Sequence, residues 1–278
     1  MRKLLSLLAI LFFSCKGSQT SSEKLSIEKG NVDKVQHSIF QELIDTSNLI
    51  GSILIYDLQN DVYHSNNFDW AEKGHLPAST FKITNTLIGL ETGVIANDSM
   101  VFEWDGQDRW SSAWETDLLL RDAFHLSCVS CYQEVARDIG VERMKDYTSK
   151  FNYGNIVLDE TSIDNFWLVG SSRISQMEQI SFLKRLYQSK LPISERTDQI
   201  MKNLMVIKNN NHYKLSGKTG LSNENDHYNG WFVGFLERDE QTLFFATNIE
   251  PKDQQIRSGF IIKRKEITIL ALNSLGYF

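Results

Sequence analysis

The sequence predicts an α/β protein in which a mixed antiparallel sheet, flanked by terminal helices, carries an inserted all-helical lobe. Three observations lead to this prediction. Strand-like alternation occupies a segment near the N-terminus and returns after residue 211, while helical periodicity fills most of the chain between them. Because the strands lie at both ends, one sheet built from both ends is the simplest arrangement. We expect the sheet lobe over about 31–78 and 206–278, and the helical lobe over about 79–205.

The first residues predict export. A basic start and ten apolar residues, Leu4 to Phe13, precede Cys15. An apolar run of this length is too short to span a bilayer and is typical of a secretion signal, here residues 1–14. The small residue before Cys15 resembles a bacterial lipoprotein signal, in which Cys15 becomes lipidated. A polar tether over 15–30 would then hold a periplasmic domain at a membrane. A plain signal peptide cut nearby is the alternative.

The composition favours a single domain over 31–278 and argues against a nucleic-acid partner. The chain has 278 residues, of which 41% are hydrophobic, which is enough for a substantial core. Its formal net charge is −6, and it becomes −8 when Arg2 and Lys3 leave with the signal. A protein that binds a phosphate backbone needs clustered positive charge, which this sequence lacks.

Two strands and a helix begin the domain. Ser52 to Asp57 and Val62 to Ser65 alternate as short strands around a Gln-Asn-Asp turn, which predicts a hairpin. Pro77 precedes a helix from about Ser79 to Glu91, and Gly93 is a suitable stop.

Helices and then strands complete the predicted fold. The helical pattern is clearest in CYQEVARDIGVERMKDYTSKF and SQMEQISFLKRLYQSKL. A final helix is expected from roughly Asp253 to Leu275. Before it, turn-rich pieces separate three predicted strands, at residues 212–220, 229–239 and 241–250.

The helix at Ser79 carries a candidate nucleophile and base. Ser79 and Lys82 lie three residues apart, so they share one helical face. A serine needs a base to become a nucleophile, and lysine is a base only when neutral, a state that burial beside Phe81 and Ile83 favours. The N–H groups of the helix start would stabilise an oxyanion. Ser-x-x-Lys alone also suits an ordinary helix start, so other features must decide whether this pair is catalytic.

Two further motifs, an inner serine and Lys-Thr-Gly, follow Ser-x-x-Lys along the chain. Ser127 lies between two helical segments, and Lys218 with Thr219 lies on a predicted edge strand. There they offer a cation and a hydroxyl to an anionic acyl substrate. Ser-x-x-Lys, an inner serine and Lys-Thr-Gly occur in this order in the serine acyltransferases that act on penicillins.

With these motifs the sequence resembles the OXA-type class D serine β-lactamases, from about Ser52 to Arg257. This family has the fold of the penicillin-binding proteins. The resemblance implies hydrolysis of the β-lactam ring of penicillin-type antibiotics through a serine acyl-enzyme, which gives resistance. It rests on PASTFK (77–82), SCV (127–129), YGN (153–155), KTG (218–220) and GWFVG (230–234), with WDGQ (104–107) and FWLVGSSRISQMEQISFL (166–183) in support.

The resemblance also implies roles in catalysis. Ser79 would be acylated, and carbon dioxide or bicarbonate would convert Lys82 to N6-carboxylysine, the base of both half-reactions. No other cofactor is implied. The Trp167 indole N–H would bond the carbamate, although an ordinary core tryptophan is the alternative. Ser127, assisted by Lys218, would pass a proton to the leaving nitrogen.

Substrate binding is implied for a second group. Thr219 and Arg257 would hold the substrate carboxylate, where Arg257 could otherwise be a solvated charge. The backbone N–H groups of Ser79 and Leu221 would form the oxyanion hole. Two apolar residues would wall the pocket and control the hydrolytic water: Val129 and Leu168.

The remaining cysteines have no clear chemical role. His125, Cys128 and Cys131 follow at three-residue steps, but three ligands overlapping the Ser-x-Val motif do not predict a metal site. Cys128 and Cys131 form either a short disulfide or two buried thiols, and we favour the thiols.

Two other functions share these motifs. A β-lactam sensor or a penicillin-binding protein would be acylated without turnover, and a decayed homologue would only bind. A sensor of this type is expected to follow a bundle of transmembrane helices, and the sequence contains none. The retention of every chemical group argues against decay, so we favour the hydrolase.

Overall fold

A computed structural model describes residues 32–254 and 258–277. Several predictions concern residues outside this part. They are the signal over 1–14, the lipidation of Cys15, the tether over 15–30 and the substrate contact of Arg257. No helix in the described ranges has the length and the apolar character that crossing a bilayer requires.

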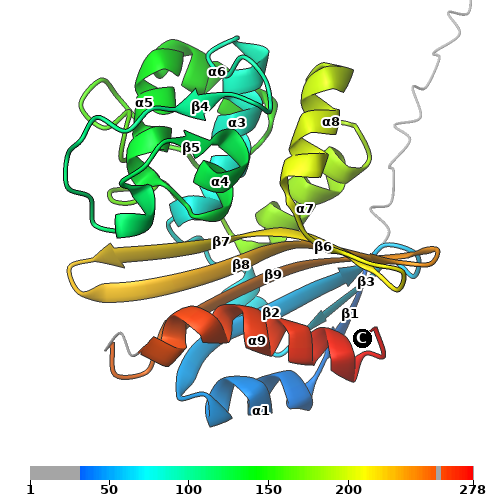
Figure 1. The fold of residues 1–278 in the computed structure, drawn as a ribbon. Coiled ribbons are helices and arrows are strands. Elements are labelled where there is room, and N and C mark those ends of the chain that lie inside the picture. Colours follow the sequence, from blue (N-terminus) through cyan, green and yellow to red (C-terminus); the bar gives the residue numbers. More distant parts are fainter. Residues whose placement is uncertain (1–31, 255–257, 278) are drawn as a thin grey trace, which may run out of the picture. The chain divides into compact units, whose positions relative to one another are not determined.

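A seven-stranded sheet forms the centre of the described part, in the order β1-β3-β2-β9-β8-β7-β6 (Figure 1). β1 runs parallel to β3 and every other neighbouring pair is antiparallel, so the predicted mixed sheet is confirmed. Its strands are β1 (Asp33–Gln36), β2 (Leu49–Asp57), β3 (Val62–Ser65), β6 (Val206–Asn209), β7 (Lys214–Glu224), β8 (His227–Arg238) and β9 (Gln241–Pro251).

The pairing of β2 with β9 joins the two ends of the chain. It runs from Leu49 opposite Pro251 to Asp57 opposite Leu243. The strands approach closely at Gly51, whose φ is +138° and where a Cβ would lie 2.2 Å from the Asn248 carbonyl oxygen. Only glycine permits this geometry. The sheet therefore depends on contacts that are distant in sequence, as the strand pattern predicted.

Helices cover both faces of the sheet (Figure 1). α1 and α9 pack on one face around an apolar cluster that includes Phe40, Phe245 and Ile267, and these are the predicted terminal helices. A larger cluster joins the other face to the helical part. The helices are α1 (Ser38–Thr46), α2 (Phe68–Glu72), α3 (Lys82–Glu91), α4 (Leu120–His125), α5 (Val129–Ile139), α6 (Val141–Lys150), α7 (Gln176–Tyr187), α8 (Glu195–Leu204) and α9 (Ser258–Ser274).

Short elements complete the helical part. Ser175 caps α7 through a reciprocal capping box with Glu178, which explains why the helix begins there. The lobe predicted as all-helical over about 79–205 also contains a small two-stranded sheet, formed by β4 (Val101–Phe102) and β5 (Leu118–Leu119). Two 3-10 turns are present, η1 (Ala78–Phe81) and η2 (Ser112–Trp114).

Two local predictions need correction. The helix expected from Ser79 begins as the 3-10 turn η1 and becomes α-helical only at Lys82. The Lys-Thr-Gly strand, β7, is also not the outermost strand, because β6 pairs with it up to Ser216. Val206, the first residue of β6, lies opposite Ser216, so Lys218 and Thr219 lie beyond the stretch of β7 that pairs with β6.

Candidate active site

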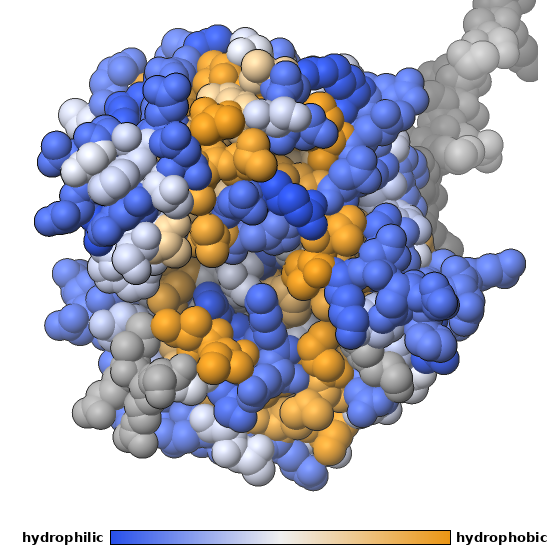
Figure 2. All heavy atoms as spheres, viewed as in Figure 1, coloured by the Kyte–Doolittle hydropathy of each residue, from blue (hydrophilic) through white to orange (hydrophobic). Residues whose placement is uncertain are grey.

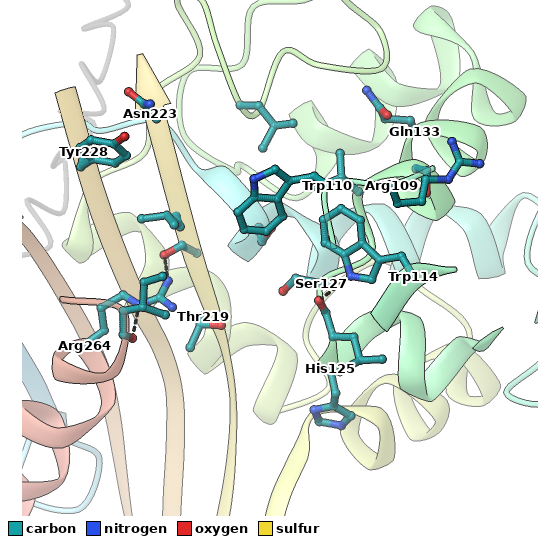
Figure 3. Close-up of a pocket in the computed structure, with 18 of the residues that line it drawn as sticks. Arg109, Trp110, Trp114, His125, Ser127, Gln133, Thr219, Asn223, Tyr228 and Arg264 are labelled. Carbon is teal, nitrogen blue, oxygen red and sulfur yellow. Dashed lines mark hydrogen bonds between the residues drawn. The ribbon is translucent and has the colours of Figure 1, made fainter. Parts of the chain in front are cut away.

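A cavity of about 890 Å³ lies where the helical part meets β7. Figure 2 shows the hollow bordered by apolar residues, and Figure 3 shows side chains from both sides converging on it. The expected site residues that line it are Ser79, Ser127, Val129, Leu168, Thr219 and Leu221.

Ser79 occupies a turn fixed from two directions. The Ala78 N–H donates to the Trp167 carbonyl at 2.7 Å, and the Trp231 indole donates to the Leu76 carbonyl at 2.8 Å. Ala78 has a φ of +50°, which is strained for a residue with a side chain. The surrounding bonds hold this strained turn, and it presents Ser79 to the cavity.

Lys82 lies directly behind Ser79. Its Nζ is 3.1 Å from Ser79 Oγ, and only 1% of the residue is exposed. Nζ also lies 5.1 Å from the centre of the Tyr132 ring. Burial lowers the pKa of Lys82 from 10.5 to about 7, because an apolar environment disfavours the charged amine. A substantial neutral fraction therefore exists near neutral pH, as general-base chemistry requires.

Trp167 packs on Phe81, the residue before Lys82, and has an unused donor. Its ring stacks on Phe81, with 5.8 Å between centroids, and is fully buried. In the described part of the chain its indole Nε1 has no hydrogen-bond partner. Since a buried donor without an acceptor is costly, this position suits an additional acceptor group.

Ser127, in the cavity wall, forms a second polar pair with Lys218. Lys218 Nζ donates to Ser127 Oγ and also to the Thr219 carbonyl, the latter at 3.1 Å. Burial, followed by the charge of Lys82, holds the pKa of Lys218 well below its usual range. Ser127 has a φ of +58°, so its backbone is also strained. The pair can transfer a proton at the edge of β7.

An arginine that the sequence analysis missed completes the β7 side. Arg264 on α9 lines the cavity, donates through Nη1 to the Gly220 carbonyl and is only 6% exposed. Burial lowers its pKa to about 10, so it stays charged at neutral pH. The predicted Arg257 lies outside the described residues.

A signal for Arg264 was present in the sequence. Phe260, Ile267, Thr268 and Ala271 form the buried stripe of α9, and Arg264 falls within the same helical repeat. A charge inside a buried stripe needs a partner or a function.

The apolar residues expected to wall the pocket do line the cavity. Val129 and Leu168 line the cavity and pack on the larger apolar cluster. Tyr153 is buried edge-on against Phe81, with 5.6 Å between ring centroids. Gly154 has a φ of +60°, and a Cβ there would lie 2.5 Å from a carbonyl oxygen. The Tyr-Gly-Asn motif therefore supports the turn beneath Ser79, which is a structural role.

The cysteine prediction is wrong. Cys128 and Cys131 are joined by a disulfide rather than present as thiols. Cys128 is the N-cap of α5, which places Cys131 one turn later, with a Cα separation of 5.5 Å that a disulfide can bridge. The bond also removes two of the three sulfur and nitrogen groups considered as metal ligands.

Comparison with known proteins decides the family. The penicillin-binding protein transpeptidase domain matches residues 50–267. The β-lactamase OXA-48 of Klebsiella pneumoniae is 42% identical over 200 residues, which cover 72% of this chain and 75% of that protein. The chain belongs to the class D β-lactamases. This membership confirms the resemblance seen in the sequence.

Solved class D β-lactamases have the same fold. The enzyme YbXI from Nostoc superposes with a TM-score of 0.82 at 39% identity, over 86% of this chain and 99% of that one. The class D β-lactamase of Sebaldella termitidis superposes with a TM-score of 0.84 at 37% sequence identity, over 88% of this chain and 99% of that one. The predicted fold class is therefore confirmed.

The two candidate arginines can be separated by mutation. We expect Arg264→Ala to raise KM by about tenfold to a hundredfold with a smaller change in kcat, since a charge-assisted bond to a carboxylate is worth about 1.5–3 kcal/mol. Arg264→Lys should recover part of the loss. Steady-state kinetics with a penicillin measure this. The opposite result would be a large rise in KM for Arg257→Ala and a near wild-type KM for a folded Arg264→Ala protein. That result would restore Arg257 as the residue that binds the substrate carboxylate.

Proposed function

We propose that this class D β-lactamase hydrolyses the β-lactam ring of penicillin-type antibiotics and so confers resistance. The contact of Lys82 Nζ with Ser79 Oγ at 3.1 Å, in the wall of the large cavity, is the observation that carries the proposal. It joins a nucleophile to a base whose pKa is lowered by burial to about 7.

Acylation would use both polar pairs. The Lys82 side chain accepts the proton of Ser79, and Oγ attacks the β-lactam carbonyl carbon. The backbone N–H groups of Ser79 and Leu221 stabilise the oxyanion. When the ring carbon–nitrogen bond breaks, Ser127 gives its proton to the nitrogen and regains one through Lys218. The bond between Lys218 and Ser127 supports this proton path.

The substrate carboxylate would bind on the β7 side. Arg264 supplies a charged fork fixed by the Gly220 carbonyl, and Thr219 offers a hydroxyl on the same strand edge. The carboxylate would thereby place the β-lactam carbonyl near Ser79. Val129 and Leu168 restrict the water that reaches the acyl-enzyme.

We further propose that Lys82 is carboxylated by carbon dioxide. When present, the carbamate supplies a base for water attack as well as for acylation. Three features fit it: the apolar burial of Lys82, its pKa of about 7, and the unpartnered Nε1 of Trp167, whose ring stacks on the neighbouring Phe81. Only the neutral amine reacts with carbon dioxide, and the indole N–H would hold a carbamate oxygen.

Export is a separate proposal. Residues 1–14 would direct secretion to the periplasm, and Cys15 would carry the lipid that anchors the domain to a membrane. The mass of the mature protein tests both points, because cleavage before an acylated Cys15 gives a species distinct from plain cleavage.

Time-resolved hydrolysis of a chromogenic cephalosporin tests the main proposal. Purified protein lacking residues 1–15 is assayed after depletion of carbon dioxide and again with bicarbonate. We expect sustained turnover that rises with bicarbonate. A burst of one equivalent that stops would instead favour a sensor or penicillin-binding protein. The absence of any burst would favour a protein that only binds.

A further inference from the structure

The Cys128–Cys131 disulfide closes a ring in the wall of the active-site cavity. The two residues enclosed by it, Val129 and Ser130, both line the cavity, and Ser127 immediately precedes it. The disulfide is therefore covalently continuous with two residues assigned to catalysis and to the pocket wall. No function described so far requires it.

Ser127 is the residue most in need of such support. Its φ of +58° is unfavourable for a serine, and it is held by its N–H bond of 3.2 Å to the Phe124 carbonyl. The next residue, Cys128, donates to the Ala123 carbonyl at 2.9 Å. Strained residues persist only where several constraints act together. The disulfide adds a further constraint on this segment, because it ties Cys128 to the first turn of α5.

We propose that the Cys128–Cys131 disulfide is a positioning element for Ser127 and Val129, and that opening it slows turnover. The inference rests on the proposed hydrolysis. It predicts that the enzyme is sensitive to thiol reductants, although no thiol takes part in the reaction.

The disulfide is open to attack from one side. Cys131 lines a second cavity of about 220 Å³, whereas Cys128 is fully buried. Cys128 Sγ accepts the Cys131 N–H at 3.2 Å, and it lies at the start of α5. Because a helix N-terminus stabilises a thiolate, Cys128 is the better leaving group.

Reduction by a dithiol would proceed in two exchanges. A reagent thiolate attacks Cys131 Sγ, the disulfide breaks and Cys128 leaves as the thiolate. The second thiol of the reagent then displaces Cys131, which is released as a thiol after protonation. The reagent ends as a cyclic disulfide, having supplied two electrons.

The test compares full-length protein in two redox states. One portion is reduced with dithiothreitol and desalted without oxygen, and alkylation mass confirms two more free thiols than the oxidised portion has, since full-length protein also contains Cys15. Hydrolysis of the chromogenic cephalosporin is followed over a bicarbonate series, before and after reoxidation. We expect kcat to fall by about tenfold on reduction, since small displacements of catalytic groups are expensive. More bicarbonate should also be needed for half-maximal rate, because Val129 lines the same cavity as Ser79, the residue that Lys82 contacts.

A matched variant separates positioning from general stability. Cys128→Ala combined with Cys131→Ala should have low kcat and no response to dithiothreitol. A disulfide that only stabilises the fold would lower the melting temperature but leave kcat and the bicarbonate requirement of the folded enzyme unchanged. That result, with two thiols confirmed, overturns the inference. A lack of turnover in the oxidised enzyme would instead contradict the proposed function.

Discussion

Replacement of Ser79 by alanine should abolish hydrolysis, with kcat falling at least about 10⁴-fold, as for other serine enzymes that lose their nucleophile. The side chain removed is the group that Lys82 contacts at 3.1 Å. Neither Ser127 nor Thr219 can substitute, because neither lies on the turn that joins the nucleophile to its base. Mass spectrometry after exposure to a penicillin should show no covalent adduct.

The variant should nevertheless fold and bind substrate. The turn around Ser79 is held mainly by backbone bonds of Ala78 and Leu76, which alanine leaves intact. Ser99→Ala, a change at an exposed turn remote from the cavity, is the matched control and should keep normal kinetics. Normal turnover in a folded Ser79→Ala protein would exclude the acyl-enzyme mechanism.

Local patterns predicted the parts of this enzyme that depend on local chemistry. The hairpin of β2 and β3, the long strands β7 to β9 and the terminal helix all follow from periodicity. Ser79 and Lys82 were paired correctly because three-residue spacing brings side chains together on an α-helix or a 3-10 turn alike. The short strand β1, which is exposed throughout, offered no apolar alternation to detect.

Features that depend on tertiary contacts were less accessible. Ser127 and Lys218 are 91 residues apart, and only the fold brings their side chains into contact. Arg264 is recognisable as unusual once the buried stripe of α9 is known, whereas its bond to the Gly220 carbonyl depends on how α9 crosses β7. The disulfide follows from the N-cap geometry at Cys128, which spacing alone could not distinguish from a pair of thiols.

Replacement of Lys82 by methionine should remove activity and at the same time stabilise the fold. Without a base, kcat should fall at least about 10³-fold. The pKa of Lys82 falls from 10.5 to about 7 on folding, so burying the amine costs about 4 kcal/mol at pH 7. Methionine fills a similar volume and needs no proton, so without bicarbonate the variant should melt about 5 °C higher or more.

The pH dependence of this gain identifies its cause. Because the folded-state pKa of Lys82 is depressed, the unfolded chain binds a proton between about pH 7 and 10.5 that the folded protein does not. The contribution of Lys82 to the stability of the wild type is therefore fully present above its unfolded-state pKa. It is lost as the pH falls towards its folded-state pKa. The melting difference between variant and wild type should grow from pH 10 to pH 7. A difference that is constant over this range would mean that packing, rather than the buried amine, explains the gain.

Bicarbonate should raise the melting temperature of wild type alone, since only its neutral Lys82 can become a carbamate that uses the free Trp167 donor. The same burial that lowers stability thus makes the amine available for chemistry.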